Sequence, residues 1–218
     1  MFVQIYGITT TEDAVAVDRL GPDSIGVVLD EGIDTWDSVD GDAARRIRSA
    51  VTRARVVALS LSTDPARVVA TARTVEPDIV HLARAHEMGT PALDSIRASI
   101  APAQLMLTVP VHGADALLVA QRLVASADYL LLDTKHPESG IVGATGRTHD
   151  WTISAAIVGA LDAPVVLAGG LGPGNVREAI AAVNPFGVDS ETRTSLDADR
   201  RRKDMAKVEE FVALARAG

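Results

Sequence analysis

The chain has 218 residues, of which 47% are hydrophobic and 23% charged, so it can bury a full core without help from crosslinks. Its net charge of −8 argues against nucleic acid or an anionic membrane as the main partner. The absence of cysteine excludes a disulfide framework, a thiolate nucleophile and a cysteine metal site. With no signal-peptide pattern and no apolar run long enough to span a bilayer, we expect a cytoplasmic protein.

Short apolar stretches alternate with stretches of helical spacing along the whole chain. The predicted strands are residues 2–6, 24–29, 54–61, 79–83, 104–111, 129–134, 164–168 and 186–190. The predicted helices are residues 11–20, 40–51, 65–75, 91–100, 114–125, 152–161, 175–183 and 202–217. Near-continuous apolar strands such as "YLLLD" and "PVVLAGG" are typical of a parallel sheet that is covered on both faces.

Eight successive β/α units predict a single (β/α)8 barrel domain, a TIM barrel, over residues 1–218. The alternative is a doubly wound open sheet. That fold is expected to carry a glycine-rich turn after its first strand, whereas "YGITTTED" contains only one glycine. The pattern therefore favours the barrel.

Two long predicted loops follow strands, on the face where barrel enzymes carry their chemistry. They cover residues 30–39 and 135–150. Arg147, in the second loop, is a candidate to close on an anionic substrate, although "GATGRT" lacks the lysine and the glycine spacing of a P-loop. The run "DADRRRKD", residues 197–204, is expected to be the solvated start of the last helix.

A glycine-rich turn follows the seventh predicted strand. It contains Gly169, Gly170 and Gly172, and Asn175 stands where the next helix should be capped. Bare backbone N–H groups at such a turn and at a helix N-terminus bind anions, most often phosphate. The alternative is a tight turn that needs positive φ. The place after strand seven favours the phosphate site.

Asp133 ends the sixth predicted strand, where a carboxylate is costly unless it faces water, a partner or a substrate. It is either a cap for the following turn or a general acid or base whose pKa is raised by partial burial. Histidines near strand ends have no fixed metal-ligand spacing, so neither a metal nor another cofactor is expected; they are His81, His112, His136 and His149.

Together these stretches resemble the phosphoribosylanthranilate isomerase family. "YGITTTEDAVAVDRLGPDSIGVVL" is similar to the opening of that family, and "LLLDTKHPESGIVGATGRTHDW" to its strand-six motif. "LAGGLGPGNVREAI" and "NPFGVDSETR" are similar to its two phosphate-loop segments. The resemblance implies an Amadori rearrangement of a phosphoribosyl amine, in which an acid, here Asp133, protonates the ring oxygen and a thiolate base removes the proton at sugar C2. The implied phosphate-binding residues are Gly169, Gly170, Gly172, Asn175, Ser190, Glu191, Thr192 and Arg193.

The sequence departs from the family on the side that binds the aromatic acid and supplies the base. Tyr6 stands where the resemblance implies the cysteine base, and Gln4 where it implies a lysine. The segment "DEGIDTWDSVD" has no lysine or arginine to hold the anthranilate carboxylate. "VHLARAHE" replaces a Gln-Leu-His-Gly run, and Asp189 is followed by "SETR" in place of a Ser-Ser-Gly run.

These departures predict an isomerase of the ketose–aldose or Amadori type that acts on a phosphorylated ribose-like sugar with a changed head group. Asp133 is its predicted acid, Tyr6 a hydrogen-bond donor to a developing enolate or ring oxygen, and His81 the nearest candidate for the base. The alternatives are a genuine phosphoribosylanthranilate isomerase of tryptophan biosynthesis and a non-catalytic sugar-phosphate binder. The expected partner is a small phosphosugar, and the expected assembly is a monomer or homodimer.

Overall fold

The computed structural model of the protein describes residues 1–29, 32, 35–113, 115–134 and 148–217. The strands in these ranges are β1 (Phe2–Ile5), β2 (Ser24–Leu29), β3 (Ser38–Val39), β4 (Arg55–Ser60), β5 (Ile79–Leu82), β6 (Gln104–Val111), β7 (Tyr129–Thr134), β8 (Val165–Leu167) and β9 (Gly187–Ser190). The α-helices are α1 (Thr11–Arg19), α2 (Gly41–Ala50), α3 (Pro65–Val75), α4 (Thr90–Ile100), α5 (Ala116–Leu123), α6 (Trp151–Ala160), α7 (Val176–Val183) and α8 (Met205–Arg216). Short 3-10 turns are η1 (Ala85–Glu87), η2 (Val124–Ser126) and η3 (Thr192–Thr194).

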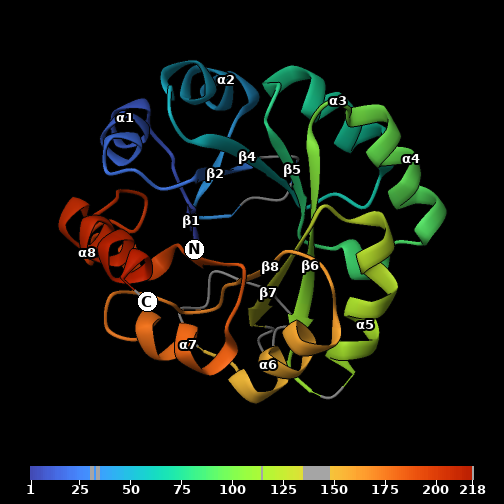
Figure 1. Ribbon diagram of the computed structural model, residues 1–218. Helices are drawn as coiled ribbons and strands as arrows, with labels where there is room; N and C mark the ends of the chain where they lie inside the picture. Colours follow the sequence, from blue (N-terminus) through green and yellow to red (C-terminus); the bar gives the residue numbers. More distant parts are fainter. Residues whose placement is uncertain (30–31, 33–34, 114, 135–147, 218) are drawn as a thin grey trace.

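The strands form one parallel sheet that closes on itself. Their order is β1-β9-β8-β7-β6-β5-β4-β2-β3, and β1 also pairs with β2, so eight strands complete a barrel and β3 adds to β2 outside it. The helices form a ring around these strands (Figure 1). The predicted (β/α)8 barrel is confirmed, and each of the eight predicted strands agrees with the observed one to within one residue at either end.

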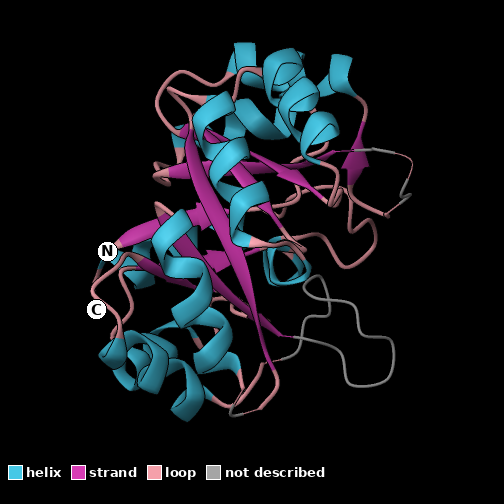
Figure 2. Cartoon of the chain, turned by 90° about the vertical axis from the view of Figure 1, so that its right-hand side faces the viewer, coloured by secondary structure: helices cyan, strands magenta, loops and turns pink. Residues whose placement is uncertain are grey.

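The apolar core has two parts because every barrel strand is covered on both faces. One part lies between the strands and the surrounding helices, which enclose the strands in side view (Figure 2). The other part fills the barrel interior with large side chains, as expected of a packed barrel rather than a pore. The interior residues are Phe2, Tyr6, Val28, Val57, Ile79, Met106, Tyr129, Leu131, Val166 and Ala168.

Aspartates set the starts of several helices by accepting hydrogen bonds from otherwise unpaired N–H groups. Asp40 caps α2, Asp64 caps α3 and Asp150 caps α6 in this way. Asp204 accepts from the backbone N–H groups of Ala206 and Lys207, so α8 begins at Met205 and not at residue 202 as predicted. No helix in the described part of the chain has the length and apolar character needed to cross a membrane.

The two termini lie side by side (Figure 1). The Arg216 guanidinium of α8 donates a hydrogen bond to the carbonyl oxygen of Met1 over 2.5 Å. The last helix therefore packs beside the first strand. The C-terminal ends of the barrel strands lie at the opposite end of the molecule, and the candidate site is there.

Candidate active site

Asp133 lies on β7 at the mouth of the barrel. Its side chain is partly exposed, and Oδ1 accepts a hydrogen bond from the Thr134 N–H over 2.7 Å. Burial of the carboxyl raises the pKa of Asp133 to about 7, and the Thr134 hydrogen bond opposes this rise only in part. A group with this pKa is poised to donate or accept a proton near neutral pH.

Asp189, on β9, is a second carboxyl at the same mouth. It is 8% exposed and lies opposite Gln4 in the register of β1 with β9. Burial, and then the negative charge of Asp133, raise the pKa of Asp189 to about 8. The Asp189 Oδ1 atom is buried without a hydrogen-bond partner among the described residues. Two carboxyls with raised pKa values thus face the same space, which is typical of an active site.

Tyr6 follows β1 and points into the barrel interior. Its hydroxyl lies 2.8 Å from His81 Nδ1, and His81 Nε2 lies 2.6 Å from Thr108 Oγ1. Gly26 makes this possible, because a Cβ atom at that position would lie 2.5 Å from the Tyr6 ring. The result is a buried Tyr6–His81–Thr108 chain that crosses the interior from β1 to β6.

This chain bears on the predicted roles of Tyr6 and His81. Burial, followed by the carboxylates of Asp189 and Glu191, raises the pKa of Tyr6 well above its ordinary value. Burial lowers the pKa of His81 to about 3, and both of its ring nitrogens are already hydrogen-bonded. His81 is therefore a poor candidate for the base, and the Tyr6 hydroxyl is hydrogen-bonded to His81; its role towards a substrate stays a prediction.

The glycine-rich turn after β8 is held by its own side chains. Gly169 and Gly170 have φ values of +84° and +64°, which favour glycine. Asn175 accepts a hydrogen bond from the Gly172 N–H over 2.9 Å and donates to the Gly170 carbonyl oxygen over 3.1 Å. The Asn175 side chain thus builds the turn, and it makes no side-chain cap for α7.

The turn after β8 lies against the segment after β9, as the two phosphate-loop predictions require. Ser190 Oγ donates a hydrogen bond to the Leu171 carbonyl oxygen over 2.7 Å. A Cβ atom on Gly172 would lie 2.5 Å from Arg193 Cβ, so the two backbones approach closely. Thr192 and Arg193 lie in η3. Phosphate binding by these two segments stays a prediction.

Glu191 was predicted to help bind phosphate, but its side chain turns towards β1 and β2. Its Oε1 atom lies 2.9 Å from the point that a Cβ on Gly7 would occupy. Asp37 hydrogen-bonds to the Glu191 side chain, and both carboxyls lie close to Lys203. The Glu191 side chain is therefore not placed to bind an anion, and phosphate binding by the backbone at this position stays a prediction.

The charged run "DADRRRKD" is exposed over residues 197–202, as predicted, but it precedes α8 and does not form its first turn. Lys203 is 4% exposed, and Arg202 makes two hydrogen bonds to the carboxylate of Asp13, of 2.9 and 3.0 Å. Arg201 donates to the carbonyl oxygens of Trp36 and Ser38. The run therefore ties the segments after β1, β2 and β9 together.

The remaining predicted residues lie apart from these carboxyls or outside the described ranges. Arg147 and His136 are outside the described residues. His149 bonds to Thr134 Oγ1 at 3.1 Å and to Ser154 Oγ at 2.6 Å, and burial lowers its pKa to about 4. His112 is near the surface beside Asp115. Within the described ranges, no three potential metal-ligating side chains converge on one point.

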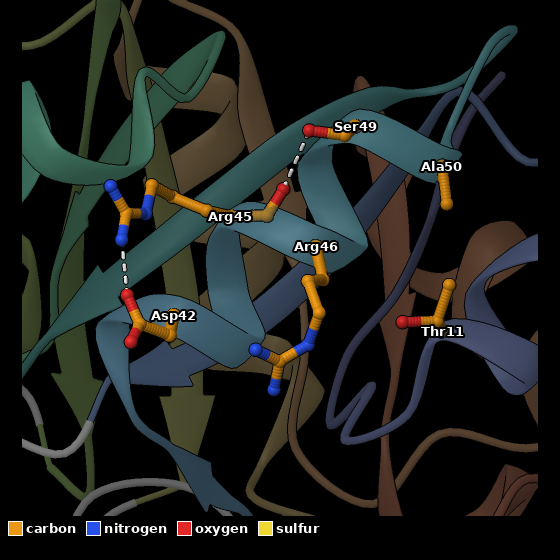
Figure 3. Close-up of a pocket in the computed structure, with 6 residues that line it drawn as sticks. All are labelled: Thr11, Asp42, Arg45, Arg46, Ser49 and Ala50. Atoms are coloured by element: carbon orange, nitrogen blue, oxygen red, sulfur yellow. Dashed lines mark hydrogen bonds and ion pairs between the residues drawn. The ribbon is translucent and has the colours of Figure 1, made fainter.

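A hollow of about 610 Å³ lies on the outer surface beside α1 and α2 (Figure 3). It is lined by Thr11, Asp42, Arg45, Arg46, Ser49 and Ala50. Arg45 pairs with Asp42, and Ser49 Oγ donates to the Arg45 carbonyl oxygen over 2.9 Å. None of these residues comes from a strand end, so this hollow is separate from the barrel mouth.

Sequence reasoning missed Thr108, Gly26, Asp37 and the burial of Lys203. Strand alternation was the available signal for two of them, since Gly26 on β2 and Thr108 on β6 both lie on the inward side that faces Tyr6 and His81. Nothing local marks Lys203, which stands in a run of charges, or Asp37, which stands in a long loop.

A (β/α)8 barrel that carries carboxyls with raised pKa values at the C-terminal ends of its strands has the architecture of a barrel enzyme. A family model described as N-(5'phosphoribosyl)anthranilate (PRA) isomerase matches residues 3–213. The chain belongs to this family.

Similar proteins span the whole chain. N-(5'-phosphoribosyl)anthranilate isomerase of Haloferax volcanii is 37% identical over 98% of this chain and 92% of that protein. The corresponding protein of Methanocella arvoryzae is 36% identical over 98% and 97%. The solved phosphoribosylanthranilate isomerase of Thermotoga maritima has a TM-score of 0.81 and 28% identity over 99% of this chain and 98% of that one. A structure of the enzyme with reduced 1-(o-carboxyphenylamino)-1-deoxyribulose 5-phosphate has a TM-score of 0.79 and 25% identity, covering 99% and 98%.

Proposed function

We propose that the protein is a phosphoribosylanthranilate isomerase that converts N-(5'-phosphoribosyl)anthranilate to its ketoamine isomer in tryptophan biosynthesis. The observation that carries this proposal is Asp133, which stands at the barrel mouth with a pKa of about 7. The proposal is also supported by similarity over nearly the whole chain, at 31–37% identity, to proteins named N-(5'-phosphoribosyl)anthranilate isomerase. In this reaction Asp133 donates a proton to the ring oxygen and opens the sugar.

The phosphate of the substrate is assigned to the segments after β8 and β9. The hydrogen bond from Ser190 to Leu171 and the close approach of Gly172 to Arg193 support this assignment, because they bring the two segments together. Backbone N–H groups of these glycine-rich turns are the proposed donors. Arg147 is proposed to act from its loop after β7.

A second candidate function is an isomerase for a related phosphoribosyl amine with a changed head group. Tyr6 favours it, because the ring fills interior space at the position where the family has a cysteine. The segment 30–39 also contains no lysine or arginine for a carboxylate. Whole-length similarity to named phosphoribosylanthranilate isomerases supports the unaltered activity over this alternative.

Complementation of a tryptophan auxotroph that lacks this isomerase tests the proposal. The wild-type chain should restore growth, and Asp133→Asn should not, since removal of a general acid costs at least about 10²-fold in rate. Asp162→Asn is the matched control, because Asp162 is exposed after α6, and it should restore growth like the wild type.

Other outcomes separate the alternatives. No growth with a folded wild-type chain, together with binding of ribose 5-phosphate, would support the changed head group. Equal ribose 5-phosphate binding and no turnover by both wild type and Asp133→Asn would support a non-catalytic binder. One solved relative is described as dimeric. We propose a monomer or homodimer here, which light scattering in solution would decide.

A further inference from the structure

Three ionisable side chains lie together between the segments that follow β1, β2 and β9: Lys203 and Asp37 are buried, and Glu191 is partly exposed. Lys203 is 4% exposed and Asp37 is 3% exposed. Lys203 Nζ donates hydrogen bonds to the Glu191 carbonyl oxygen and to Ser195 Oγ, both over 3.0 Å. The Glu191 carboxyl hydrogen-bonds to Asp37 and interacts electrostatically with Lys203. Burying ionisable groups together is costly, and clusters with perturbed pKa values concentrate at functional sites.

The Glu191 carboxyl lies over the backbone of Gly7, directly after the position where the family has its base. Glu191 Oε1 is 2.9 Å, and Lys203 Nζ 3.3 Å, from the point that a Cβ on Gly7 would occupy. Gly7 also has a φ of +69°, so no side chain fills this space. The Oε1 atom is buried and has no hydrogen-bond partner among the described residues.

Asp189 is a second carboxyl at the mouth, but it stands where the resemblance already implies an aspartate beside the thiolate base. Other groups at the mouth are not available as the base. His81 has both ring nitrogens hydrogen-bonded, and the Tyr6 hydroxyl is bonded to His81. Asp133 is required in its protonated form as the acid. The chain has no cysteine. Glu191 is the carboxyl that the sequence adds at this end of the barrel, where the resemblance implies a small residue.

We propose that Glu191 is the general base that removes the sugar C2 proton in place of the family thiolate, with Lys203 and Asp37 as its positioning residues. This inference depends on the proposed isomerase activity and deepens it. Burial and the neighbouring Asp37 raise the pKa of Glu191, while the positive charge of Lys203 opposes the rise. In its ionised form, which the positive charge of Lys203 favours, the carboxylate is a stronger base than an exposed glutamate.

The proton and electron balance of the reaction closes without a further reactant. After Asp133 has opened the ring, the C2–H bond breaks and its proton moves to Glu191. The electron pair of that bond forms the C1–C2 double bond, and the π electrons of the protonated C1–N double bond return to nitrogen. Glu191 then delivers the proton to C1 while ionised Asp133 takes the proton of the C2 hydroxyl, which becomes a ketone. Both carboxyls end in their starting states.

The test compares Glu191→Gln, Glu191→Ala and Glu191→Asp with Glu209→Gln, a control on the exposed face of α8. Turnover of N-(5'-phosphoribosyl)anthranilate is measured with C2–H and C2–D substrate, with and without added formate. We expect Glu191→Gln to lose about 10²- to 10⁴-fold in kcat, with KM within about threefold and a larger deuterium isotope effect. Formate should restore part of the activity of Glu191→Ala, because it supplies the missing carboxylate, and Glu209→Gln should match the wild type.

Two results would overturn the inference while leaving the proposed function intact. One is a Glu191→Gln enzyme whose kcat stays within about threefold of an active wild type. The other is a loss of activity that formate does not restore and that comes with an unchanged isotope effect. If Glu191→Gln fails to fold, Glu191→Asp decides, since a displaced carboxylate should slow proton removal and raise the isotope effect. A wild-type chain that does not turn over the substrate overturns the proposed function and this inference with it.

Discussion

Removing the Tyr6 hydroxyl isolates the interaction that the structure assigns to this residue. In Tyr6→Phe the 2.8 Å hydrogen bond to His81 Nδ1 disappears, and the ring that packs over Gly26 stays. Tyr6 and His81 are 4% and 2% exposed, so water cannot replace the lost partner. One His81 ring nitrogen is then buried and unpaired, which costs about 1–3 kcal/mol of unfolding free energy.

In a domain of this size that loss corresponds to a fall in Tm of about 2–12 °C. Thermal unfolding measured by circular dichroism gives the Tm, and steady-state turnover gives kcat. We expect kcat to stay within about threefold of the wild type, because the hydroxyl is bonded to His81. Tyr129→Phe is the matched control at the other end of the barrel. There Arg55 keeps its 2.8 Å hydrogen bond to Gln104, so the fall in Tm should be smaller.

Two results would refute this reasoning. An unchanged Tm would mean that the Tyr6–His81 hydrogen bond contributes nothing. A loss of about 10²-fold or more in kcat with little change in KM would mean that the hydroxyl stabilises charge in the transition state, as predicted from the sequence.

Three further predictions follow from the barrel mouth and the turn after β8. Asp133 must be protonated to act as an acid and its pKa is about 7, so kcat/KM should fall as the pH rises above about 7; in Asp133→Asn the residual rate should lose this dependence. The pKa of Asp189 is raised from 3.8 to about 8, so its contribution to stability is complete below pH 3.8 and is lost as the pH rises through 8. Between pH 5 and pH 9, the free energy of unfolding measured in urea should fall less for Asp189→Asn than for the wild type. An equal fall in the two proteins would contradict the assigned pKa. Gly169→Ala should lose about 1–3 kcal/mol of stability, because φ is +84° and the added methyl would collide with Thr134 Oγ1. Gly174→Ala, whose Cβ would meet nothing within 4 Å, is the control in the same unfolding assay.

The local sequence pattern was sufficient to predict the strands and helices that make the barrel. Strands such as β2, β6 and β7 were predicted with their observed limits, because a strand buried on both faces is a continuous apolar run between polar turns. The two residues of β3 escaped prediction, since a pair this short has no periodicity. Helix α8 was predicted to begin too early because charged residues in helical spacing precede Asp204, whose side chain sets the true start.

The position of Asp133 at a strand end was also evident from sequence, because a carboxyl that ends an apolar strand must face the mouth once the barrel is known. The groups around Asp133 were not evident from the sequence. No local pattern marks Asp189 as part of the site, because its pKa depends on burial and on the charge of Asp133 across the mouth.

The sequence by itself determined the strands, the helices, the closed barrel and the place of Asp133 at a strand end. Those features follow from side-chain periodicity and from the turn residues, which act over a few positions along the chain. Only the tertiary structure decided that Tyr6 bonds to His81, which lies 75 positions away, and that Arg202 binds Asp13 across 189 positions. It likewise decided that Glu191 lies over Gly7 beside a buried Lys203. The physical reason is that closing the barrel brings β1 beside β9, and the burial that results sets the pKa values and hydrogen bonds of the groups at the mouth.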